Sequence, residues 1–229
     1  MLVLDLYSET RPQWGDPEST WLRKEGFNGH DWAFCMLLNF GGNVGLYGKL
    51  QHVVDEYYKA RQSKFASTLK GVGLTMEGIE NNPVMYELVS ELPWRNNKFG
   101  WQEWLNNYVE ARYGNINNTK VHDDWMLLAR SVYGASDKVL EQGCHESVLC
   151  ARPVLDVYQV SSWSEMEEFY NPDDVIRAAQ LMVEASHEVK ANANFRYDLV
   201  DITRQAIAEK ARYVYAEIVA AYRAKDRKM

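Results

Sequence analysis

The chain has 229 residues, of which 46% are hydrophobic and 13% aromatic, so it can bury the core of one large domain or two small ones. Its formal net charge of −7, with no basic stripe before the last few residues, argues against nucleic-acid binding. No apolar run approaches the roughly 18 residues that a membrane span needs, and the first residues lack the pattern of a signal peptide. The three cysteines have no metal-ligand spacing, and nothing else in the sequence indicates a metal or a cofactor, so we expect neither.

The first two predicted strands are almost continuously apolar, as buried parallel strands are. They cover residues 2–7 (LVLDLY) and 32–38 (WAFCMLL). Glu9 follows the first strand, and the second runs into a loop, residues 39–43 (NFGGN). The two glycines of that loop suit a close approach between the backbone and a ligand.

A third strand with interleaved glycines, residues 70–74 (KGVGL), delivers a lone carboxylate, Glu77. Residues 50–60 form a predicted helix before this strand, and the polar turn after it opens a helix that carries Tyr86. Strands alternating with helices predict a parallel α/β sheet. Three strands cannot close a barrel, which needs eight strands and roughly 250 residues. They form either a small open sheet or part of a longer protein.

Glu77 has two interpretations at this point. An acid at the carboxyl end of a parallel strand is where barrel enzymes place catalytic groups. A glutamate in such a position can equally be a solvated loop residue, and strand pattern alone does not decide between the two.

Helical patterns replace strands after Pro93. Apolar residues recur at helical spacing over residues 101–114, 125–134, 175–190 and 197–224, and Asn171 with Pro172 predicts the start of the third of these helices. We therefore expect an α/β part followed by an all-α part.

Five stretches together resemble one known family, the alpha-N-acetylglucosaminidases, which are glycoside hydrolases. They occur in family order and cover residues 2–9 (LVLDLYSE), 35–47 (CMLLNFGGNVGLY), 71–86 (GVGLTMEGIENNPVMY), 130–133 (RSVY) and 196–205 (RYDLVDITRQ). The resemblance implies that residues 1–95 are the C-terminal portion of a TIM-like (β/α) barrel catalytic domain. It implies that residues 96–229 are the start of an α-helical C-terminal domain.

The resemblance places Glu77 at the family's catalytic nucleophile. A retaining glycosidase uses two carboxylates about 5 Å apart, one to attack the anomeric carbon and one to protonate the leaving oxygen. The family's acid/base glutamate lies in an Asn-Glu pair on an earlier strand, and this sequence contains no Asn-Glu pair. Glu9 is the alternative acid within the chain.

The resemblance also implies substrate contacts, each with a structural alternative. Tyr86 could hydrogen-bond the sugar or the nucleophile, or could pack its helix. Asn39 could contact the sugar or close its turn, and Cys35 could line the pocket or pack in the core. Phe34 stands where the family is expected to have Trp and can still offer a ring face; Glu9 completes the set.

The function implied is a retaining exo-glycosidase that removes terminal alpha-linked N-acetylglucosamine from glycans. One alternative is a non-catalytic carbohydrate-binding or structural fragment, and another is a helical interaction module. The expected partner is therefore a glycan, with no nucleic acid and no membrane span, and an incomplete barrel would favour self-association through exposed strand edges. The family suggests a lysosomal or a secreted or periplasmic location.

Leu38 departs from the family pattern, because a polar residue is expected there.

Overall fold

The computed structural model describes residues 1–15, 26–38, 40–43, 45–78, 82–114, 118–136, 147–160 and 167–225. These residues fall into two compact units. The first is Met1–Trp101 with Ala135–Gly143, and the second is Gln102–Gly134 with Cys144–Met229.

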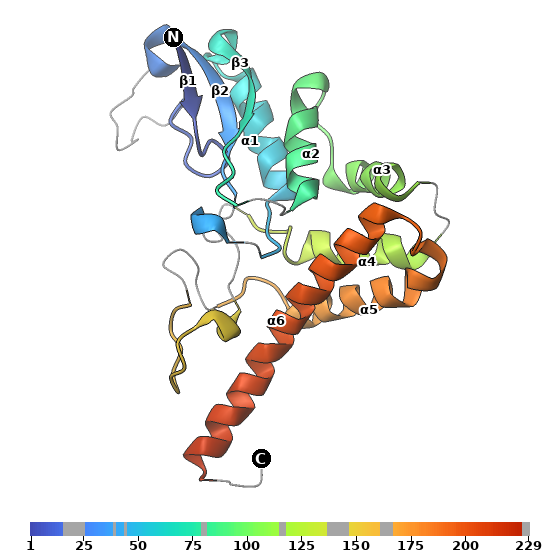
Figure 1. The fold of residues 1–229 in the computed structure, drawn as a ribbon. Coiled ribbons are helices and arrows are strands. Elements are labelled where there is room, and N and C mark those ends of the chain that lie inside the picture. The colour runs from blue at the N-terminus through green and yellow to red at the C-terminus, as the bar shows by residue number, and fades with distance from the viewer. Residues whose placement is uncertain are drawn as a thin grey trace. The chain divides into compact units, whose positions relative to one another are not determined.

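The first unit is built on a parallel sheet with the strand order β1-β2-β3 (Figure 1). The strands are β1 (Leu2–Asp5), β2 (Asp31–Met36) and β3 (Leu69–Leu74). This confirms the three predicted strands, although β1 and β2 end two residues earlier than expected. At β1 the reason is a turn, in which the Tyr7 carbonyl accepts the backbone amides of Thr10 and Arg11. The Asp5 carboxylate at the end of the strand also accepts the amides of Gln13 and Trp14 in the loop that follows.

One face of the sheet packs against helix α1 (Leu50–Gln62). Phe34 in β2 is in register with Asp5 and Val72, so all three side chains share that face. The Phe34 ring is fully buried and lies edge-on to Tyr57 of α1, with ring centroids 5.6 Å apart. The apolar positions predicted for α1 are buried on this face: Leu50, Val53, Val54, Tyr57 and Tyr58.

The opposite face of the sheet carries small or exposed residues. Leu2 and Leu4 of β1 are 55% and 52% exposed. Gly73 of β3 is in register with Cys35, and a Cβ atom at Gly73 would lie only 2.6 Å from the Cys35 Sγ. Glycine is needed there because the cysteine thiol occupies the space.

Helix α2 (Pro83–Glu91) follows β3, and Asn82 fixes its start. Asn82 is fully buried with φ at +46°; its Oδ1 accepts the amide of Tyr47 at 3.0 Å and its Nδ2 donates to the carbonyl of Gly45 at 3.1 Å. The loop after β2 is thereby tied to the helix that carries Tyr86. Both α1 and α2 lie to one side of the strands in Figure 1.

The second unit is helical, as the sequence predicts. It contains α3 (Trp101–Tyr113) apart from its first residue, together with α4 (Thr119–Arg130), α5 (Pro172–Val189) and α6 (Ala193–Arg223). Helix α5 packs against both α4 and α6 (Figure 1). Asn118, Asn171 and Asn192 cap the last three helices through their side chains.

Two buried polar clusters tie these helices together. In one, Arg112 of α3 pairs with Asp198 of α6, and Tyr113 donates its hydroxyl to the same carboxylate at 2.6 Å. In the other, the Arg212 Nε lies 2.5 Å from Glu168 Oε1 and 3.6 Å from Glu209 Oε2. Both clusters lie wholly within the second unit.

Candidate active site

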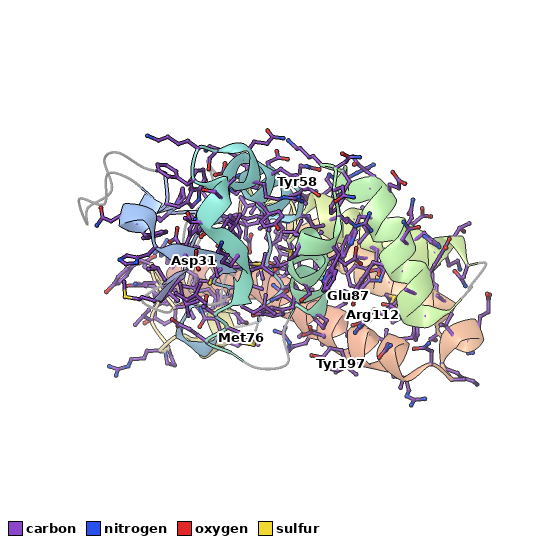
Figure 2. All side chains as sticks on the ribbon, turned by 90° about the horizontal axis from the view of Figure 1, so that it is seen from above. Asp31, Tyr58, Met76, Glu87, Arg112 and Tyr197 are labelled. Carbon is purple, nitrogen blue, oxygen red and sulfur yellow. The ribbon has the colours of Figure 1, made fainter. Side chains whose placement is uncertain are left out.

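Glu77 lies three residues beyond the end of β3 and is exposed. Its Oε2 accepts the backbone amide of Gly41 at an N···O distance of 2.5 Å. Met76, which precedes it, is 45% exposed and is labelled in Figure 2. The structure therefore brings the predicted carboxylate to the loop that follows β2.

The strand ends beneath Glu77 are joined by Thr75, whose role the sequence reasoning missed. The Thr75 amide donates to the Met36 carbonyl at 3.0 Å, and its Oγ1 lies 2.9 Å from both the Met36 and the Leu6 carbonyls. All three strands are thus connected at their carboxyl ends. A threonine just past a strand is too common a feature to have marked this role.

Glu9 is buried, with 3% of its surface exposed. Its Oε1 accepts the amide of Leu37 at 3.1 Å, and its backbone carbonyl lies 2.6 Å from Nε2 of His52. Burial raises the pKa of Glu9 well above its ordinary value, outweighing the backbone hydrogen bonds and the Lys49 charge, which lower it. The adjoining cavity, of about 10 Å³, is far too small for a sugar ring.

Cys35 and Tyr86 both lie close enough to Glu9 for its charge to affect their pKa values. Burial raises the pKa of the Cys35 thiol to about 11, with the charges of Asp5 and Glu9 adding to the effect. Burial likewise raises the pKa of Tyr86 to about 12, with Glu9 adding to it. The Tyr86 hydroxyl and Oε2 of Glu9 are both buried without a hydrogen-bond partner among the described residues.

The remaining sequence predictions fare differently. Phe34 faces α1, and its ring is fully buried there, so the geometry does not support a contact between this ring and a sugar. Leu38 is 3% exposed and lines the small cavity beside Glu9. Asn39 lies outside the described residues.

Within the part of the chain that the structure describes, no cluster of three or more His, Cys, Asp or Glu residues could hold a metal ion. No helix there is both long enough and apolar enough to cross a bilayer. The chemistry available at the strand ends is that of an exposed carboxylate held by a backbone amide.

A carboxylate presented beyond the carboxyl end of a parallel strand is the arrangement of enzymes built on β/α barrels. Comparison with family models identifies the family. Residues 1–96 match the tim-barrel domain of alpha-N-acetylglucosaminidase (NAGLU), and residues 104–229 match the C-terminal domain of the same family. The chain belongs to the alpha-N-acetylglucosaminidase family of glycoside hydrolases.

Relatives and solved structures agree with this assignment. The human alpha-N-acetylglucosaminidase is 36% identical over 227 residues, which cover 99% of this chain and 28% of the human protein. A family 89 glycoside hydrolase from Clostridium perfringens, solved with 2-acetamido-1,2-dideoxynojirmycin, superposes with a TM-score of 0.84 at 29% identity. A variant of the Clostridium enzyme solved with its substrate, GlcNAc-alpha-1,4-galactose, also gives 0.84, at 28% identity. Each of these two matches covers 97% of this chain and 24% of the solved chain, so this chain spans about a quarter of its relatives' length.

Proposed function

We propose that this chain supplies the nucleophile side of a retaining exo-glycosidase that hydrolyses terminal alpha-linked N-acetylglucosamine, with Glu77 as the nucleophile. The observation that carries this proposal is the position of Glu77, exposed beyond β3 and fixed by the Gly41 amide. An oxygen of this carboxylate would attack the anomeric carbon and form a covalent glycosyl-enzyme, which water then cleaves.

The acid/base carboxylate belongs, in this proposal, to a part of the barrel outside these residues. Glu9, the alternative within the chain, is buried and bound to the amide of Leu37, so it cannot protonate a leaving oxygen near Glu77 without rearrangement. The substrate-bound Clostridium variant replaces two glutamates, more than a hundred residues apart, with glutamine.

We propose that Tyr86 and Asn39 contact the substrate. The other candidates, Cys35, Phe34 and Glu9, are assigned structural roles around the pocket. Cys35 contributes packing against Gly73, and Glu9 holds the end of β2 through Leu37. We also keep residues 1–95 as the barrel portion and residues 96–229 as the helical portion.

The test is hydrolysis of 4-nitrophenyl alpha-N-acetylglucosaminide, because nitrophenolate leaves without a proton and so bypasses the missing acid. We expect turnover by the chain and its loss in Glu77→Gln, which keeps the shape of the side chain and removes its charge. Glu87→Gln, on the exposed surface of α2 (Figure 2), is the control and should retain turnover. Equal rates in the chain and in Glu77→Gln would exclude Glu77 as the nucleophile.

The alternative is a non-catalytic carbohydrate-binding fragment. The burial of Glu9 favours it, because the chain then lacks an available second carboxylate at this site. Binding of N-acetylglucosamine that survives Glu77→Gln, without turnover of the nitrophenyl glycoside by either form, would support this alternative.

A further inference from the structure

We propose that the backbone amide of Gly41 is the group that positions the nucleophile, holding Oε2 of Glu77 so that Oε1 is the oxygen that attacks. This inference rests on the proposed function and deepens it. The amide nitrogen lies 2.5 Å from Oε2, whereas no other described residue donates a hydrogen bond to this carboxylate.

The contact depends on an unusual backbone conformation. Gly41 has φ of +66° and ψ of 19°, and Gly42 follows with φ of +75°. Residues with a side chain are strained in this left-handed conformation, whereas glycine adopts it at little steric cost. The two glycines turn the chain after β2 so that the Gly41 amide points at a side chain 36 residues further along the sequence.

The second glycine of the turn also lies close to Glu77. A Cβ atom at Gly42 would lie 3.6 Å from the backbone carbonyl oxygen of Glu77, which is ordinary van der Waals contact. The Phe40–Gly42 turn therefore lies close to both the side chain and the backbone of Glu77.

This geometry has a chemical consequence. An exposed glutamate normally samples several rotamers, and a hydrogen bond from a fixed amide to a carboxylate restricts that freedom. With Oε2 held, Oε1 forms the bond to the anomeric carbon while the bond to the aglycone breaks and the aglycone takes its electron pair. The amide keeps its proton throughout, so Gly41 is a positioning residue and not a proton donor.

The hydrogen bond can be measured without any activity. Labelling with ¹⁵N-glycine gives an amide spectrum of 14 residues, in which the signal of Gly41 is the one lost in Gly41→Ala. A donor to a carboxylate resonates downfield. We expect this signal to move upfield more than any other glycine signal in Glu77→Ala, and by a smaller amount in Glu77→Gln. A Gly41 signal that stays in place in both variants would overturn the proposal.

Kinetics supply the second arm, with Gly29 as the matched control. Gly29 is also left-handed, with φ of +79°, and a Cβ atom there would meet nothing within 4 Å. Gly29→Ala therefore adds similar backbone strain away from Glu77. We expect Gly41→Ala to lower kcat on the nitrophenyl glycoside by about 10²-fold at unchanged KM. Gly29→Ala should keep kcat within about twofold, a span of roughly 0.4 kcal/mol.

The outcomes separate the two claims. Equal kcat values in Gly41→Ala and Gly29→Ala would overturn the positioning role. If the unmodified chain turns over no nitrophenyl glycoside, the proposed activity of the isolated chain fails, and the glycine spectrum still decides whether Gly41 holds Glu77.

Discussion

Arg112 and Asp198, which lie 86 residues apart in the sequence, form a two-pronged ion pair in the helical unit. The guanidinium Nε and one terminal nitrogen of Arg112 lie 2.5 and 2.8 Å from the two carboxylate oxygens, and both side chains are largely buried. Arg112 is labelled in Figure 2. The Tyr113 hydroxyl adds a third hydrogen bond, so the carboxylate is well satisfied despite its burial.

Removing one member of this pair should be costly. We expect Asp198→Ala to lower the free energy of unfolding by about 3–5 kcal/mol, because the Arg112 charge would remain buried without its partner. Urea unfolding of the whole chain measures the change. Glu184→Ala is the control, since Glu184 pairs with Lys120 and Arg177 on the surface. A loss in Asp198→Ala no larger than in the control would contradict this account.

Asp124 should make stability depend on pH. It is fully buried in α4, neither carboxylate oxygen has a hydrogen-bond partner among the described residues, and burial raises its pKa well above the ordinary value, with Asp198 adding to the effect. Because the folded state holds a proton that the unfolded state releases, stability falls as pH rises between the unfolded and the folded pKa.

The substitution Asp124→Asn isolates that contribution. We expect the free energy of unfolding of the variant to exceed that of the original chain by more at pH 7 than at pH 4. The extra gain is about 1.4 kcal/mol for each pH unit between the pKa of Asp124 in the unfolded state and its pKa in the folded state, up to pH 7. The measurement is the free energy of unfolding at both pH values in both proteins. An equal difference between the proteins at the two pH values would show that Asp124 is ionised in the folded state.

In the cluster of Glu168, Glu209 and Arg212, we expect the contribution of Arg212 to stability to depend on pH. Burial raises the pKa of Glu168 to about 8, with Glu209 adding to the rise and Arg212 lowering it. Removing the guanidinium in Arg212→Met should raise that pKa further and leave the two carboxyls without a neutralising charge. We expect the resulting loss of stability to be larger at pH 8 than at pH 5, because Glu168 is protonated at pH 5 and its charge then does not repel Glu209. A loss independent of pH would assign Arg212 a packing role only.

Gly73 should be intolerant of a side chain because of Cys35. A Cβ atom at Gly73 would lie 2.6 Å from the Cys35 Sγ, and overpacking of this kind costs typically 1–3 kcal/mol. We expect Gly73→Ala to destabilise the chain by about that amount. Adding Cys35→Ala should recover most of the loss, because it vacates the same space. A double variant whose loss equals the sum of the two single losses would show that the residues do not compete.

The sequence predicts those parts of the fold that have local signals. Asn171 before Pro172 marks the start of α5, and the interleaved glycines before Glu77 mark β3 and the carboxylate beyond it. The apolar spacing on α1 identifies its buried face correctly. Each of these inferences needs only residues that are near neighbours along the chain.

The rest depends on long-range contacts. The contact between Gly41 and Glu77 joins two loops, and a glycine pair in a sequence indicates a turn without indicating what its amides bind. Phe34 lies in β2, which is buried on both faces. Its sequence therefore shows no alternation of apolar and polar residues from which one could tell which face of the sheet carries Phe34. Burial of Glu9 is equally hidden, because an acid just past a strand resembles a solvated loop residue until the packing around it is known.

The most direct test of the central claim is covalent trapping of Glu77. The probe is 5-fluoro-N-acetyl-α-glucosaminyl fluoride, whose fluoride leaves without protonation and whose ring fluorine slows hydrolysis of the glycosyl-enzyme. We predict that mass spectrometry of the digested chain finds one sugar, attached through an ester to Glu77, and that the label is absent from Glu77→Gln. A label on Glu9 or on any other carboxylate would contradict the account.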